Sequence, residues 1–205
     1  MDASSINAFS ISGVLEIIYR YSEPHRRYHT MAHVSRMFEL AVKLGIDLSD
    51  AHCIAIIMHD AIYRIPADPG VNEEESADLL SQMYRDGLVS MSDDDFQKAV
   101  TYIRDTFLAL SPRRDEIVDW TVPGLDLYAL GTEEYWSNRN LVREEYCMVL
   151  GSKAWHSGRL KFLQSLHKSP YVINKSFFRS NDDCSEWHRM MTWNVYRETK
   201  ELNNG

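Results

Sequence analysis

Five of the eight histidines fall within residues 25–59 of the chain. His29 and His33 are four residues apart, a spacing that places both side chains on one face of a helix. His59 and Asp60 end an apolar segment, where a buried carboxylate is costly unless it is paired or bound to a metal ion. Imidazole and carboxylate groups are ligands of divalent metal ions in proteins. These residues therefore indicate a metal site, although a histidine on a helix is more often structural.

Helix geometry predicts that His33 and His59 meet. Apolar residues recur at helical spacing over about residues 28–44, and a second helix, apolar on all sides, is expected over residues 50–63. His33 lies about 18 Å of helix before the connection between them, and His59 lies about 14 Å beyond it. Two antiparallel helices with a short connection would bring the two imidazoles to nearly the same level.

The rest of the chain also predicts helices. Apolar spacing and capping residues indicate helices over about 11–21, 72–86, 92–110, 132–150, 155–168 and 183–202. Pro112 and the pair Pro123-Gly124 are expected to bracket a short segment between helices. No convincing alternation of apolar and polar residues predicts paired strands. The expected fold class is all-α, in a single domain whose last helix packs as a C-terminal extension.

Composition and charge narrow the class of protein. The 205 residues are 44% hydrophobic and 25% charged, which is ordinary for a globular chain and argues against disorder. No apolar run approaches the ~20 residues that cross a bilayer. Residues 1–5 lack the basic segment of a signal peptide, so we expect a cytoplasmic protein that binds no membrane. The formal net charge of −8 disfavours long nucleic acid as a partner but allows a local basic pocket for a phosphate.

Five short motifs follow one another in a fixed order. They are Arg26-Arg27-Tyr28-His29 with His33 after it, His59-Asp60-Ala61-Ile62-Tyr63, Asn72-Glu73-Glu74-Glu75-Ser76-Ala77, Asp126-Leu127-Tyr128-Ala129-Leu130-Gly131 and Arg143-Glu144-Glu145-Tyr146. The series resembles the HD superfamily of metal-dependent phosphohydrolases, most of all a bacterial group of HD-domain hydrolases. The first motif also resembles the YHNxxHA motif of cyclic nucleotide phosphodiesterases. The resemblance covers about residues 19–165 and implies one HD-type helical bundle over residues 1–205, with a C-terminal helical extension over about 170–205.

The resemblance implies a set of metal ligands: His33, His59, Asp60 and Asp126. The ion would be divalent, with Mn, Co, Mg, Zn, Ni and Fe all open, and a single ion is expected because no set of extra histidines could hold a second. His29 matches the phosphodiesterase histidine that protonates the leaving oxygen, although it could instead orient His33. The bacterial group has a further histidine after the helix that carries Thr106, and this chain has none there.

Four other residues of the motifs each have two interpretations. Asn72 and Glu73 either reach the water on the metal ion, with Glu73 in a catalytic role, or form the N-cap and acidic first turn of a helix. Arg26 and Arg27 either bind a substrate phosphate through their forked N–H groups or are surface arginines.

The remaining polar and aromatic residues are expected to have structural roles. Arg143 is expected to form an ion pair with Glu144 or Glu145. Three histidines lie outside the motifs and are expected to be structural or exposed: His156, His167 and His188. Three aromatic residues recur at helical spacing in the last helix and predict a core or a homodimer face: Trp187, Trp193 and Tyr196.

Three functions are compatible with these residues. The first is a metal-dependent phosphohydrolase that acts on a nucleotide or a similar small phosphorylated molecule. The second is a hydrolase or oxygenase of another reaction class on the same scaffold, since one fold supports many reactions. The third is a catalytically inactive sensor that binds a metal ion or a nucleotide. The missing histidine favours the sensor, whereas the retained ligand set and His29 favour the enzyme.

Overall fold

The computed structural model describes residues 8–168 and 172–204. Within these residues the fold is all-α, as predicted, with an isolated bridge between Phe9 and Val89 and no strand. The α-helices are α2 (Ile11–Tyr21), α3 (Met31–Leu44), α4 (Asp50–Met58), α5 (Val71–Arg85), α6 (Asp93–Leu108), α7 (Thr121–Leu127), α8 (Tyr135–Leu150), α9 (Ser152–Lys168) and α10 (Asn181–Asn204). Short 3-10 turns are η1 (Arg114–Glu116), η2 (Tyr128–Gly131) and η3 (Lys175–Phe177).

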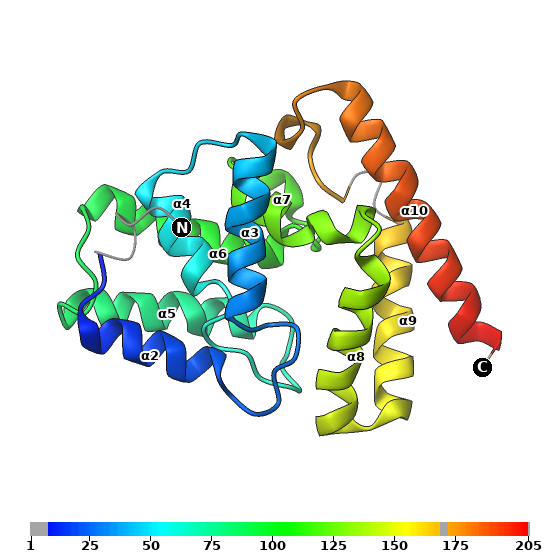
Figure 1. Ribbon diagram of the computed structural model, residues 1–205, viewed down its shortest axis with the longest axis horizontal. Helices are drawn as coiled ribbons and strands as arrows, with labels where there is room; N and C mark the ends of the chain where they lie inside the picture. Colours follow the sequence, from blue (N-terminus) through cyan, green and yellow to red (C-terminus); the bar gives the residue numbers. More distant parts are fainter. Residues whose placement is uncertain (1–7, 169–171, 205) are drawn as a thin grey trace.

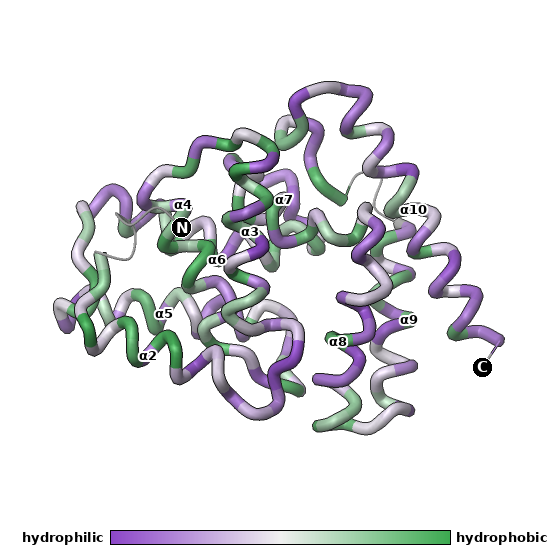
Figure 2. The backbone as a smooth tube through the Cα atoms, viewed as in Figure 1, coloured by the Kyte–Doolittle hydropathy of each residue, from purple (hydrophilic) through white to green (hydrophobic). Residues whose placement is uncertain are grey.

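Two buried hydrophobic clusters hold these helices together. The first draws on α2 to α7 and is centred on α4, in which seven of nine residues are buried. The second lies among the end of α7, α9 and α10, and α8 and α10 both pack against α9 (Figure 1). Phe177 packs against both clusters. Figure 2 shows the contrast between the apolar α4 and the more polar α10, which covers one side of the molecule.

The structure differs from the expected helix boundaries where tertiary contacts decide. The helix expected over residues 50–63 ends at Met58, because the chain turns at His59, its C-cap. Pro123 and Gly124 lie inside α7 rather than beside a break. Pro123 is tolerated because it falls in the first turn, whose N–H groups have no intrahelical partner. Gly124 is required because a Cβ there would lie 2.2 Å from the ring of Phe177.

The C-terminal helix is an integral part of the second cluster. Trp187, Met191 and Val195 on α10 are buried in it, whereas Trp193 and Tyr196 are about half exposed. The aromatic residues of this helix therefore divide between core and surface. The expected single domain and homodimer stay predictions. None of the helices in the described ranges is long and apolar enough to cross a membrane.

Candidate metal centre and cavity

His33 on α3 and His59 at the end of α4 meet as predicted. Their Nε2 atoms are 3.3 Å apart, and each residue is only 2% exposed. Nδ1 of His59 lies 2.9 Å from the carbonyl oxygen of Ile56. Because a carbonyl oxygen only accepts hydrogen bonds, Nδ1 carries a proton and Nε2 is the atom that can ligate a metal ion.

Two carboxylates complete the cluster. Oδ2 of Asp60 lies 3.1 Å from Nε2 of His59 and 3.9 Å from Nε2 of His33. Oδ1 of Asp126, on α7, lies 3.1 Å from Nε2 of His33 and 3.9 Å from Nε2 of His59. The ligand atoms of His33, His59 and Asp60 all lie within 4.8 Å of one another, so this group could hold a metal ion. Asp126 offers a fourth donor atom beside it.

Burial and the nearby charges shift the pKa values of the clustered groups in different directions. Burial by itself lowers the pKa of His59, but Asp60 and Asp126 raise it overall to about 9. Burial raises the pKa of Asp60, but His59 and the other nearby histidines hold it far below its usual range. The pKa of His33 is lowered, chiefly by burial. Without a metal ion, the cluster therefore holds a proton on His59, and a metal ion that binds there must displace it.

His29 lies beside this cluster, in the loop before α3. Its Nδ1 is 2.7 Å from Oε2 of Glu145 on α8, and its ring stacks on Tyr63 with the ring centroids 4.0 Å apart. Because a carboxylate accepts, Nδ1 of His29 donates to it, which leaves Nε2 for other partners. Burial alone would lower the pKa of His29, but the carboxylates of Asp60 and Glu145 raise it overall.

Glu145 fixes the whole loop that carries His29. The residue is 0% exposed, and its Oε1 accepts backbone N–H groups from Arg27, Tyr28 and His29 at 2.7–2.9 Å. These bonds and the proximity of His29 lower the pKa of Glu145, against the effect of burial. The carboxylate therefore orients His29 and stabilises the backbone on either side of it.

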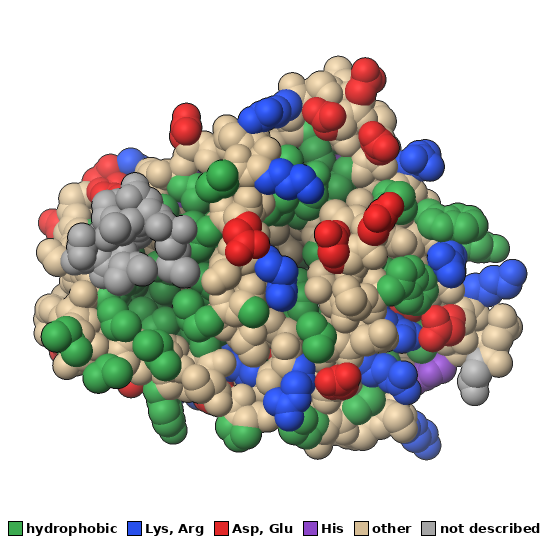
Figure 3. All heavy atoms as spheres, in the orientation of Figure 1, with side chains coloured by type: hydrophobic (Ala, Val, Ile, Leu, Met, Phe, Trp, Pro, Cys, Tyr) green, Lys and Arg blue, Asp and Glu red, His purple; other side chains and the backbone are tan. Residues whose placement is uncertain are grey.

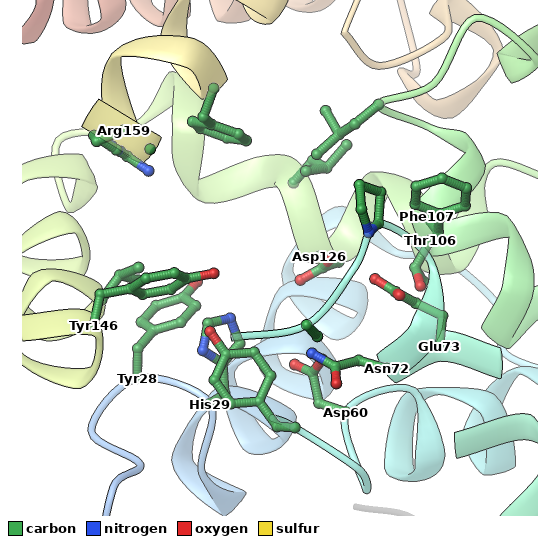
Figure 4. A pocket seen from close by; sticks show the side chains of 18 of the residues that line it. Tyr28, His29, Asp60, Asn72, Glu73, Thr106, Phe107, Asp126, Tyr146 and Arg159 are labelled. Atoms are coloured by element: carbon green, nitrogen blue, oxygen red, sulfur yellow. The ribbon is translucent and has the colours of Figure 1, made fainter. Parts of the chain in front are cut away.

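A cavity of about 650 Å³ opens at the four candidate metal ligands, which we call the metal cluster: His33, His59, Asp60 and Asp126. Asp60, Asp126, His29 and Glu73 line one part of it, and side chains from α8 and α9 line the rest. Figure 4 shows Glu73 and Asp126 directed into the cavity on one side and Arg159 on the other. The volume is that of a site for a small organic molecule.

No family model, curated protein or solved structure matches this chain. The resemblance to the HD superfamily therefore stays a prediction from motifs.

The structure opposes the predicted role of Arg26 in binding a substrate, whereas the same role for Arg27 stays a prediction. Neither residue lines the cavity. Arg26 is 3% exposed, and its guanidinium donates to one carboxylate and three carbonyl groups, those of Glu23, His29, Asp60 and Ala61. Arg27 is exposed and donates to the carbonyls of Pro24 and Arg26. Because these bonds occupy its donors, Arg26 holds the backbone of His29 and Asp60 in place instead of binding a ligand.

Asn72 and Glu73 have separate roles. The N-cap of α5 is Gly70, with φ of 84°, so the expectation that Asn72 caps this helix is wrong. Oδ1 of Asn72 instead accepts from the backbone N–H of Arg64 at 3.0 Å. Glu73 lies in the acidic first turn of α5 and also lines the cavity. Burial raises its pKa, and the carboxylates of Asp60 and Asp126 raise it further.

The structure also shows where Arg143, Thr106 and the three histidines outside the motifs lie. Within the described residues Arg143 makes no ion pair with Glu144 or Glu145, so that prediction is wrong. The connection between Glu145 and His29 spans 116 residues of sequence and has no local signal. Thr106 lines the cavity, and the apolar Phe107 and Leu110 lie there with it. The three histidines outside the motifs do not line the cavity: His156, His167 and His188.

Proposed function

We propose that this protein is a metal-dependent phosphohydrolase that acts on a small phosphorylated molecule of the nucleotide class. The observation that carries the proposal is the convergence of His33, His59, Asp60 and Asp126 at one end of a cavity, with His29 beside them. Two imidazole nitrogens and two carboxylate oxygens form a donor set that suits a divalent transition metal ion. The lowered pKa of Asp60 also keeps its carboxylate negatively charged, the form that binds a metal ion.

These four residues would hold the ion. A divalent ion bound there would supply a water molecule of lowered pKa and a positive charge for the oxygens of the phosphoryl group. Because Nδ1 of His29 is held by Glu145, Nε2 is the atom that donates a proton to the departing oxygen. The raised pKa of His29 favours its protonated form near neutral pH. Glu73, whose carboxylate faces the cavity, is placed to accept a proton from the attacking water.

One observation favours a second candidate, an inactive sensor of a metal ion or nucleotide. The stretch after Thr106, where the bacterial group has a histidine, presents Phe107 and Leu110 to the cavity. An apolar wall at this point can bind a ligand without taking part in proton transfer. A measurement of phosphate release separates the two candidates.

The test is the release of phosphate by the purified protein. Substrates are nucleoside mono-, di- and triphosphates and cyclic nucleotides, each with Mn²⁺, Co²⁺, Mg²⁺ or EDTA. The variant Asp60→Asn removes a ligand charge, and Asp68→Asn removes a charge from an exposed position on the same cavity. We expect metal-dependent turnover that falls about a hundredfold or more in Asp60→Asn and stays unchanged in Asp68→Asn. Bound metal ion and nucleotide without any turnover would refute the enzyme and support the sensor.

A further inference from the structure

We infer that the wall of the cavity formed by α8 and α9 binds a planar ring of the substrate, and that Arg159 donates a hydrogen bond to an acceptor on that ring. The inference rests on the proposed function only for the phosphate, which would lie at the metal cluster. It assigns the substrate class as nucleotides whose base, and not only whose phosphate, is recognised.

One nitrogen of the Arg159 guanidinium is not used by the described part of the protein. Its side chain is 10% exposed, and its Nε and Nη2 atoms bind the two oxygens of Glu198 at 3.1 and 3.0 Å. Nη1 has no hydrogen-bond partner within residues 8–168 and 172–204. Figure 4 shows the end of this side chain directed into the cavity. Because Glu198 takes only Nε and Nη2, the N–H groups of Nη1 are available to an acceptor on a molecule bound in the cavity.

A second donor on the same wall is also without a partner. The indole Nε1 of Trp155 is buried, and among the described residues it makes no hydrogen bond. Trp155 is 5% exposed and lines the cavity. The guanidinium carbon of Arg159 lies 5.4 Å from the ring centroid of Trp155 and 4.8 Å from that of Phe162. These rings hold the guanidinium in a fixed plane and make the surroundings apolar.

The charge of this wall favours a neutral acceptor over a second phosphate. Glu198 is 0% exposed and binds Arg139 as well as Arg159, with a further bond from the hydroxyl of Tyr135. Arg139 also lines the cavity, but each of its three guanidinium nitrogens already donates a hydrogen bond, to Glu198, Asn140 and Glu201. The two acidic partners therefore offset the two arginines. An offset charge with a rigid N–H donor suits a carbonyl oxygen or ring nitrogen.

Apolar and aromatic side chains give the wall the character of a ring-binding site. The ring centroids of Tyr146 and Trp155 lie 5.8 Å apart. Both residues line the cavity together with Phe162 and Leu130. A cavity of about 650 Å³ holds far more than a phosphate group. A nucleoside 5′-monophosphate has both parts that the cavity offers to bind: a phosphate for the cluster of Asp60 and a ring for the wall of Arg159.

The experiment measures binding, so that it does not depend on turnover. Isothermal titration calorimetry on the metal-free protein in EDTA compares nucleosides and nucleoside 5′-monophosphates with ribose 5-phosphate, which has no ring. Arg159→Lys keeps a cation for Glu198 but loses the forked donor. Arg139→Lys is the matched control, because Arg139 binds the same Glu198 and each of its nitrogens, unlike Nη1 of Arg159, already donates to a protein acceptor.

We expect at least one nucleotide to bind about tenfold more tightly than ribose 5-phosphate, and Arg159→Lys to remove most of that difference while Arg139→Lys keeps it within twofold. Nucleotides that bind no more tightly than ribose 5-phosphate, or equally to wild type and Arg159→Lys, would overturn the inference even if the protein hydrolyses phosphate esters. Binding of nucleotides that depends on Arg159, without metal-dependent turnover, would uphold the inference and refute the proposed function. If Arg159→Lys does not fold, the double variant Arg159→Met, Glu198→Gln removes both charges and serves the same comparison.

Discussion

Replacement of Glu145 tests how the loop that carries His29 is held. Its carboxylate makes four hydrogen bonds, three from backbone N–H groups and one from Nδ1 of His29, and the residue is completely buried. Glu145→Ala would leave three backbone N–H groups, one buried and two partly buried, and the ring of His29 without their acceptor. Loss of one partner from a buried charged network costs about 3–5 kcal/mol. The exposed neighbour Glu144 is the matched control, for which Glu144→Ala should change stability by less than about 0.5 kcal/mol.

Urea unfolding followed by circular dichroism at 222 nm measures both variants, and an unchanged slope shows that the unfolding transition stays comparable. Glu145→Gln keeps one neutral acceptor oxygen and should lose about 2 kcal/mol. The pKa of Glu145 is lowered in the folded protein, so its contribution is present above the ordinary pKa of a glutamate and is lost as the pH falls through the lowered value. The deficit of Glu145→Gln should therefore narrow in acid. Equal stability of the Glu144 and Glu145 variants at pH 7 would refute this reasoning.

Four further predictions concern other parts of the molecule. Because the pKa of His59 is raised to about 9 in the metal-free cluster, its proton competes with a metal ion. Calorimetry should show that the affinity for Mn²⁺ falls about tenfold for each pH unit between 8 and 6. An affinity for Mn²⁺ that does not change with pH would contradict this competition. Burial, with a second carboxylate nearby, raises the pKa of Asp105 to about 6, so the cost of its charge grows as the pH rises from the ordinary pKa of an aspartate to about 6 and is complete above that pH. Asp105→Asn should then raise the free energy of unfolding by about 1 kcal/mol at pH 8 and by much less at pH 4, and an equal gain at both values would argue against the charge as the cause. Gly124→Ala places a Cβ 2.2 Å from the ring of Phe177 and should cost about 1–3 kcal/mol in urea unfolding. Gly158→Ala, where the added Cβ meets nothing within 4 Å in α9, should instead stabilise the protein by about 0.5–1 kcal/mol.

Local patterns in the sequence were sufficient to predict most helices and the meeting of His33 with His59. Both follow from rules that act over a few residues, namely apolar spacing, capping and the rise of a helix. The same rules failed at Pro123 and Gly124, because the contact that makes a glycine necessary there comes from Phe177, more than fifty residues later. A local signal for a break cannot reveal that a distant ring fills the space of a missing side chain.

The chemistry of the arginines was not predictable for a related reason. Arg26 stands beside His29 in the sequence, as a phosphate ligand could, but its side chain turns inward to three carbonyl groups. Arg159 lies outside every motif, yet it lines the cavity. The direction of a long side chain depends on which acceptors the fold brings near it. The acceptors Glu145 and Glu198 lie on α8 and α10, and they reach their partners only through the tertiary packing of these helices. Residue type therefore predicted the cluster of candidate metal ligands better than the rest of the cavity.

The sharing of Glu198 by two arginines also bears on the order in which the protein becomes functional during synthesis. The four residues of the metal cluster all leave the ribosome before Arg139, and Arg159 follows. Until Glu198 appears, 39 residues after Arg159 and 59 after Arg139, the far wall of the cavity carries two cations without their common counter-ion. A nascent chain would thus contain all four candidate metal ligands well before the ion pairs of the opposite cavity wall could form.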